Sequence, residues 1–169
     1  KGEFTNKEYV INHYILSSGL QEMIEATSIG KDIKQVFASK YIYGNNSNAV
    51  SPGTTINYTS KVQYLFRINK GIMNHWDNET LNSWVPIKER PVPFSRMIYI
   101  GDGDTDIPAM KTVRSQGGVS IAVFDPEKWE SHQNQQRIYK LISEDRVQYV
   151  APANYTNGSQ LDIVVKGVI

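Results

Sequence analysis

The segment "GDGDTD", residues 101–106, places three aspartates at alternate positions directly after the apolar run "RMIYI". Carboxylates this close together repel one another unless a cation compensates their charge. Asp102 and Asp106 are therefore candidate ligands for a hard divalent cation such as Mg²⁺, which prefers oxygen ligands. A glycine on each side of Asp102 permits a sharp turn and a close approach of the backbone to a ligand.

A second group of polar residues ends an earlier strand-like segment. In "HYILSSGLQEM" the apolar residues give way to Ser17, Ser18 and Gly19 before a helix-like pattern starts. Unpaired backbone N–H groups at the start of a helix can bind an anion, but hydroxyls are also the preferred capping residues. These residues are thus either phosphate ligands or ordinary turn and cap residues.

A lysine stands between these two groups in the sequence. Lys61 begins the helix-like segment "KVQYLFRINKG", where a cation opposes the helix dipole. It is either a solvated lysine or the counter-ion of a bound phosphate. Hydroxyls, a lysine and a carboxylate pair are together the groups needed to hold a phosphate and a divalent cation.

The elements that would position these residues are alternating strands and helices. Apolar runs and their bounding turn residues predict strands at 12–16, 96–100, 119–124 and 147–153, helices at 20–28, 61–70, 107–118, 125–144 and 158–169, and a hairpin or strand pair within 35–60. This alternation predicts an α/β fold with a right-handed parallel sheet. Ligands bind outside the carboxyl ends of such strands, where Ser17 and Asp102 stand.

Composition limits the classes of function. The 169 residues suit a single domain, 1–169, and their formal net charge of +1 gives no electrostatic signature for binding nucleic acid. No cysteine is available for a disulfide or a thiolate metal site. No apolar run approaches the roughly 18 residues of a membrane span. We therefore expect a cytoplasmic protein that binds neither nucleic acid nor membrane.

The order of these motifs resembles a known family. "ILSSG", then Lys61 at a helix start, then "IYIGDGDTDIPAM" are similar to motifs two, three and four of the haloacid dehalogenase-like (HAD) hydrolases, and "GGVSIAVFDPEK" is similar to the segment after the acidic motif in phosphoserine-phosphatase-like members. The resemblance covers nearly the whole chain. It implies a Rossmann-like parallel sheet flanked by helices and a magnesium-dependent phosphatase acting on a small phosphorylated molecule.

The resemblance also implies how phosphate is held. The Ser17 hydroxyl and the backbone N–H groups after it, at Ser18 and Gly19, would hold a phosphate oxygen. Lys61 would neutralise the phosphate and the attacking carboxylate, a function suited to a compact ammonium.

For the metal, the resemblance implies that Asp102 binds Mg²⁺ directly. Asp106 would support the ion directly or through a water, since magnesium usually keeps several waters. Asp104 falls at a variable position of the motif and is not included among the expected ligands.

One motif of the family is missing. The hydrolases attack phosphate with an aspartate in an Asp-x-Asp-x-Thr motif that ends their first strand, and nothing before Ser17 matches it. The chain therefore resembles the later part of a HAD core, incomplete at its N-terminal strand and without a cap. We expect it to be inactive alone, and to pair with a separate N-terminal segment or with itself through open sheet edges.

The sequence suggests two other classes of function. A calcium-binding EF-hand loop starting at Asp102 is excluded, because its sixth position should be Gly and is Ile107, and its twelfth should be Glu and is Val113. A non-catalytic fragment or pairing partner, which needs a separate N-terminal segment, stays open beside the enzyme.

Overall fold

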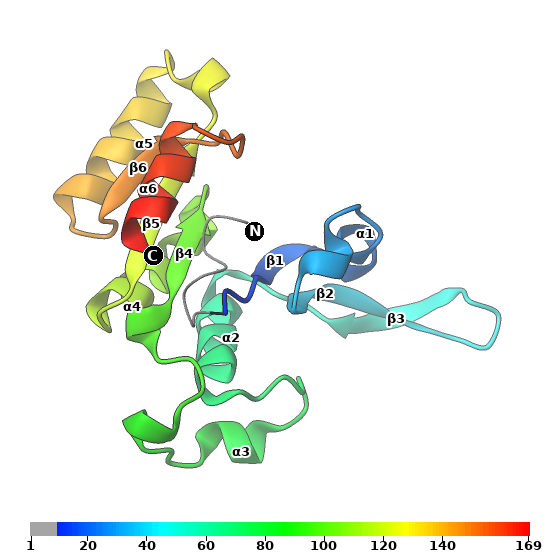
Figure 1. Ribbon diagram of the computed structural model, residues 1–169. Helices are drawn as coiled ribbons and strands as arrows, with labels where there is room; N and C mark the ends of the chain where they lie inside the picture. Colours follow the sequence, from blue (N-terminus) through cyan, green and yellow to red (C-terminus); the bar gives the residue numbers. More distant parts are fainter. Residues whose placement is uncertain (1–9) are drawn as a thin grey trace. The chain divides into compact units, whose positions relative to one another are not determined.

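The computed structural model describes residues 10–169. The chain divides into two compact units, the first ending at Asn57 and the second spanning Tyr58–Ile169, and each is described by itself (Figure 1). Each unit has one three-stranded sheet, so the fold is mixed α/β. The prediction of a single domain over residues 1–169 stays a prediction.

The second unit is built on a wholly parallel sheet. Its strands lie in the order β4-β5-β6, with bounds β4 Ile98–Gly101, β5 Val119–Phe124 and β6 Tyr149–Pro152. All three strands were expected from their apolar runs. The predicted parallel sheet is confirmed for this unit.

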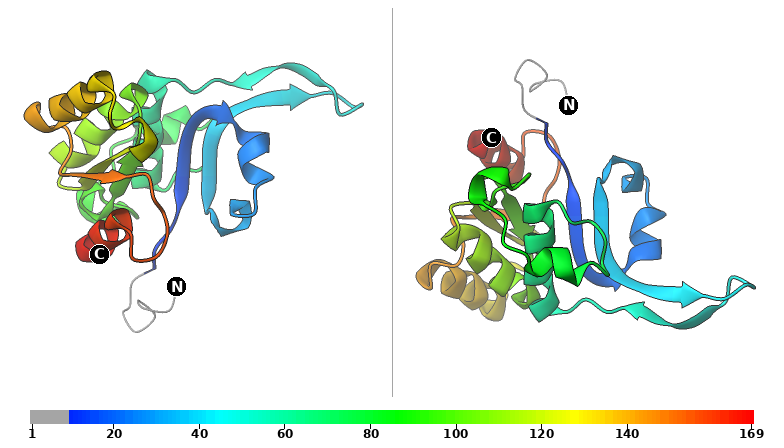
Figure 2. Two further views of the ribbon diagram at one scale, coloured as in Figure 1. Left: turned by 90° about the horizontal axis from the view of Figure 1, so that it is seen from above. Right: turned by 90° about the horizontal axis from the view of Figure 1, so that it is seen from below.

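Helices cover both faces of this sheet, with α6 on one side and α4 and α5 on the other (Figure 2). Their bounds are α4 Ile107–Ser115, α5 His132–Ser143 and α6 Gln160–Val168. Successive residues of β5 explain the two layers, because strand side chains alternate between faces. Ile121 packs in a cluster with Leu161 of α6, whereas the hydroxyl of Ser120 donates to the carbonyl of Met110 in α4 at 2.8 Å.

Helix α2, Tyr58–Lys70, packs against α4 and ends where Gly71 adopts φ +73°. This positive φ is costly for other residues, and the helix end predicted at residue 70 is confirmed. The helical period of this segment predicts a buried face with Val62, Leu65 and Phe66, and this prediction was partly wrong, although Leu65 is buried. Phe66 is 37% exposed, while Arg67 is fully buried.

Arg67 organises the chain that follows α2. Its guanidinium donates to four acceptors, namely the carbonyl oxygens of Asn74, His75 and Asp77 and the side-chain oxygen of Asn78. The short helix α3, Asn78–Asn82, begins there, with Asp77 accepting from the backbone N–H of Thr80. The segment after α2 thus has a defined shape.

In the first unit, strand β1, Tyr14–Leu20, pairs in parallel with β2, Gln35–Tyr43. Leu16 pairs with Phe37, but the next pair joins Leu20 to Ser39. Three residues of β1, 17–19, therefore face a single residue of β2. This is a bulge, which bends a strand and redirects its side chains.

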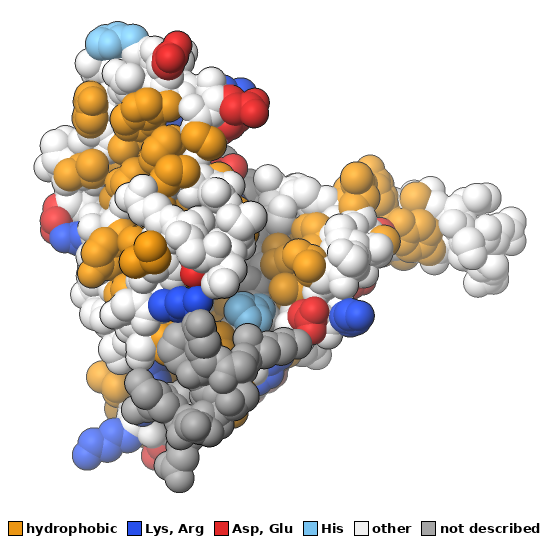
Figure 3. Space-filling view, turned by 45° about the horizontal axis from the view of Figure 1, so that its top comes forward, with side chains coloured by type: hydrophobic (Ala, Val, Ile, Leu, Met, Phe, Trp, Pro, Cys, Tyr) orange, Lys and Arg blue, Asp and Glu red, His pale blue; other side chains and the backbone are white. Residues whose placement is uncertain are grey.

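The first unit also contains the short helix α1, Gln21–Glu25, and strand β3, Ala49–Thr54, antiparallel to β2. The hairpin predicted within residues 35–60 is confirmed. Figure 3 shows apolar side chains along this hairpin. The large ones that are more than a third exposed are Tyr41, Ile42, Tyr43 and Val50.

Of the five predicted helices, α4 begins at the expected residue, whereas the other four starts differ, that of α6 by two residues, at Gln160 instead of residue 158. Helix α1 begins after Leu20 and has five residues, so Ser17 and Ser18 are not its caps. Helix α2 begins at Tyr58, three residues before the start predicted at Lys61. Asp125 does accept from Glu127 N, but it caps a 3₁₀ turn at Pro126–Lys128, and α5 starts only at His132.

Among residues 10–169, no helix has both the length and the apolar character needed to cross a membrane.

The core of the second unit allows a direct test. Ile121→Ala, at a fully buried position between β5 and α6, is expected to lower the free energy of unfolding by about 2–5 kcal/mol, because it removes apolar contacts and leaves a cavity. Urea unfolding followed by circular dichroism measures it. Ile163→Ala, on α6 but 64% exposed, is the matched control and should change stability by at most about 0.5 kcal/mol. Equal losses in the two variants would contradict the assignment of the core.

Candidate functional site

A buried ion pair joins α2 to the turn after β4. The Nζ atom of Lys61 lies 2.7 Å from Oδ1 of Asp106, and each residue is 5% exposed. Charges so far from water need close partners, because desolvation is not otherwise compensated. Lys61 Nζ also lies 3.4 Å from the hydroxyl of Thr105. The sequence-predicted Lys61 and Asp106 are thus brought together.

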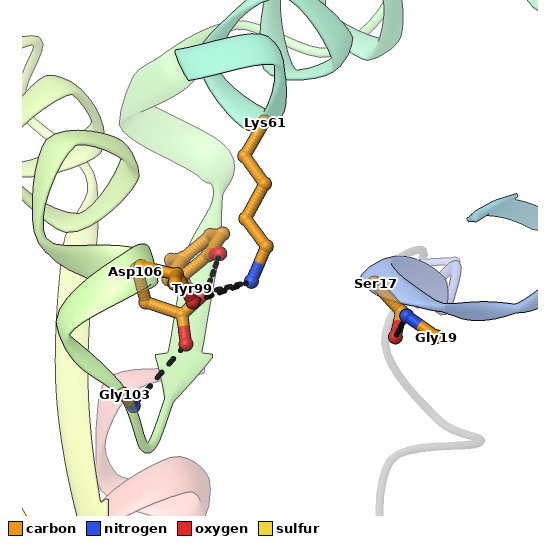
Figure 4. A network of polar contacts seen from close by, with 7 residues as sticks. Ser17, Gly19, Lys61, Tyr99, Gly103 and Asp106 are labelled. Carbon is orange, nitrogen blue, oxygen red and sulfur yellow. Dashed lines mark hydrogen bonds and ion pairs between the residues drawn. The ribbon is translucent and has the colours of Figure 1, made fainter. Parts of the chain in front are cut away.

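The Asp106 carboxylate receives two further donors (Figure 4). The phenol of Tyr99 donates to Oδ1 at 2.6 Å, and the backbone N–H of Gly103 donates to Oδ2 at 3.3 Å. Burial of the Tyr99 phenol, followed by the nearby Asp106 charge, raises the pKa of Tyr99 above its ordinary value. The phenol therefore keeps its proton and remains a donor.

The local sequence makes this close packing possible. A Cβ atom on Gly101 would lie 2.7 Å from the Asp106 Cβ and 2.7 Å from the Met110 Cε. Only glycine leaves room there for the carboxylate side chain. After Gly103 the chain forms a 3₁₀ turn over Asp104–Asp106 and continues directly into α4.

Asp102 has a different environment. It is exposed, and its backbone carbonyl accepts a 2.9 Å hydrogen bond from the Arg137 guanidinium of α5. Asp104 is also exposed. Within residues 10–169, no three His, Cys, Asp or Glu side chains gather in a way that could hold a metal ion.

The residues present therefore match a magnesium site only in part. Asp102 offers an exposed carboxylate, but the Asp106 carboxylate is occupied by Lys61, Tyr99 and Gly103. The joint binding of a metal by Asp102 and Asp106 stays a prediction.

The expected phosphate-binding residues Ser17, Ser18 and Gly19 lie in the bulge of β1 in the first unit. The backbone N–H of Gly19 donates to Ser17 Oγ at 3.0 Å, as drawn in Figure 4. The hydroxyl of Ser39 in β2 donates to the Ser18 carbonyl at 3.2 Å. Ser17 therefore shapes its own turn, and its proposed function as a phosphate ligand stays a prediction.

Two polar residues of this site were not anticipated from the sequence. Tyr99 could have been found, because a tyrosine inside a buried strand needs a partner for its hydroxyl. No local signal marks Arg137, which reaches Asp102 from a helix 35 residues further along the chain.

Comparison with known proteins gives little further guidance. No family model matches the sequence, and no solved structure matches it. An uncharacterized protein of Borreliella burgdorferi is 30% identical over 173 residues, an alignment that covers 92% of this chain and 56% of the relative. The chain thus spans about half the length of the curated relative it matches.

Breaking the buried pair should be costly. Lys61→Met leaves the Asp106 carboxylate buried without its cation, so we expect a loss of about 3–5 kcal/mol in the free energy of unfolding, measured by urea denaturation.

The control is the same substitution at an exposed ion pair. Lys140 lies 3.8 Å from Glu144 and its side chain is 72% exposed, so Lys140→Met should have almost no effect. If Lys61→Met were as mild as Lys140→Met, the pair would not be a structural requirement.

Proposed function

We propose that this chain is the phosphate- and metal-binding part of a magnesium-dependent phosphomonoester hydrolase of the HAD type, with a Rossmann-like core. The observation that carries the proposal is the buried Lys61–Asp106 pair beside the Gly101–Gly103 turn. A lysine fixed in this way at the carboxyl end of a parallel strand is suited to meeting an anion, because ligands bind at that edge of such sheets.

Lys61 has the chemistry for this task. Its ammonium has three N–H groups, of which one is directed to Asp106 and a second, more weakly, to Thr105. The third N–H is proposed to donate to a phosphate oxygen and to offset the charge that develops during transfer. The Ser17 hydroxyl, in the first unit, stays a predicted phosphate ligand, as the resemblance implies.

Magnesium is proposed to bind through the exposed carboxylate of Asp102, with water and phosphate oxygens as further ligands. When bound, the ion would neutralise negative charge on the phosphate. Arg137 holds the carbonyl of the same residue and so fixes the turn from which this carboxylate projects.

The nucleophile is proposed to come from a strand outside this sequence. Strand β4 is hydrogen-bonded to β5 on one side and has no strand partner on its other side among residues 10–169. Such an edge can accept an added strand. An aspartate at the end of that strand would attack phosphorus through a carboxylate oxygen as the bond to the leaving alcohol breaks, and water would then hydrolyse the aspartyl phosphate.

The metal ligand can be tested in this chain. Mg²⁺ is expected to bind weakly to the wild type and detectably less to Asp102→Asn, because the substitution removes the charged oxygen ligand. Isothermal titration calorimetry measures Mg²⁺ binding by the wild type and by Asp102→Asn. The matched control is Asp104→Asn, two residues further along the same turn. Identical responses of the wild type and Asp102→Asn would exclude Asp102 as a ligand.

Activity is tested with an aryl phosphate. We expect turnover at background level for this chain and Mg²⁺-dependent turnover once an upstream Asp-x-Asp-x-Thr segment is added, because the present residues can stabilise charge but offer no acceptor for the phosphoryl group. Changing the first aspartate of the added motif to Asn should abolish the gain.

Two outcomes would contradict this scheme. Turnover by this chain alone, lost in Asp102→Asn, would show that one of its own residues is the nucleophile. Phosphate binding without turnover after addition of the upstream segment would instead favour the non-catalytic pairing partner.

A further inference from the structure

Tyr99, the second residue of β4, shares a hydrogen-bond acceptor with Lys61. Tyr99 is 9% exposed, and its phenol donates to Asp106 Oδ1 at 2.6 Å. The same oxygen accepts from Lys61 Nζ at 2.7 Å. Two donors from different elements, β4 and α2, therefore meet on one oxygen atom.

The remaining oxygen of this carboxylate is also held. Gly103 N donates to Oδ2 at 3.3 Å, so the plane of the Asp106 carboxylate is fixed at both ends. The terminal torsion of an aspartate is otherwise broad, because rotation about an sp³–sp² bond has shallow minima. The direction of the Lys61 ammonium depends on that plane, since its shortest contact is with the carboxylate.

We propose that Tyr99 is a positioning residue for Lys61, acting through the shared oxygen of Asp106 to fix the direction in which the ammonium presents its remaining N–H group. The catalytic consequence rests on the proposed function. The structural consequence is independent of that function: the Lys61 ammonium is held more tightly than the ion pair alone would hold it.

The hydrogen bond from Tyr99 to Asp106 is suited to positioning Lys61. Buried hydrogen bonds to a charged acceptor are stronger than neutral ones, and a buried tyrosine hydroxyl is costly unless it has a partner. Burial and the Asp106 charge raise the pKa of Tyr99, which keeps the phenol a donor. A phenylalanine would pack almost equally well and would leave Oδ1 with Lys61 as its only side-chain donor.

The test compares two deletions of a buried phenol. Tyr99→Phe removes the donor to Asp106. Tyr64→Phe is the matched control, because Tyr64 is 6% exposed, lies on the same helix as Lys61, and has its hydroxyl 3.3 Å from His75 Nδ1. The probe is the ¹H–¹⁵N signal of the Lys61 ammonium in protein labelled at lysine, assigned by its absence in Lys61→Arg.

In the wild type this ammonium is expected to exchange its hydrogens with water slowly enough to be seen, because it is buried and paired. In Tyr99→Phe the exchange should become roughly tenfold faster, the factor that corresponds to loss of one hydrogen bond to a charged group. Tyr64→Phe should leave the exchange rate unchanged even if it lowers the free energy of unfolding. If Tyr99→Phe does not fold, Tyr99→Leu serves as the second variant without a phenol.

Three results would overturn the proposal. They are an unchanged Lys61 signal in a folded Tyr99 variant, an equal acceleration in Tyr64→Phe, and the absence of a slowly exchanging Lys61 signal in the wild type. Addition of inorganic phosphate separates this proposal from the proposed function. If phosphate fails to shift the Lys61 signal while the two variants still differ, the phosphate site is refuted and the positioning by Tyr99 stands.

Discussion

The burial of one lysine and one aspartate is the constraint on which the second unit depends. Neither Lys61 nor Asp106 can be removed from water without the other, so α2 and the turn after β4 have to meet where the two charges meet. Other features follow from this contact. Gly101 has no side chain because the carboxylate lies against it, and Tyr99 brings its phenol to the same oxygen.

Much of this unit could be predicted from local patterns. The strand at 119–124 has the predicted bounds because a continuous apolar run covered on both faces leaves little ambiguity. Helix α2 was less predictable, since a helical period assumes that apolar side chains face the core. The structure instead buries Lys61 and Arg67, whose partners come from distant or later segments. A period in the sequence cannot show that a charged side chain will find such partners.

The first unit shows a different limit. The segment around Ser17 was expected to end a strand and start a helix, but β1 continues to Leu20 through a bulge. Serine and glycine suit both arrangements, and only pairing with β2 decides between them. For the site, residue types were enough to identify Lys61 and Asp106 as candidates. Their mutual ion pair, and the hydrogen bond from Arg137 to Asp102, depend on tertiary contacts.

Arg67 holds the segment after α2 without a charged partner, whereas Lys61 is paired with the Asp106 carboxylate. Its guanidinium is surrounded by three backbone carbonyls and the Asn78 side chain, all of them uncharged acceptors. A guanidinium does not lose its proton in proteins, and amides do not titrate. These four hydrogen bonds therefore need no ionised acceptor. One unit thus buries two cations in two ways, Lys61 against a carboxylate and Arg67 against backbone carbonyls and an amide.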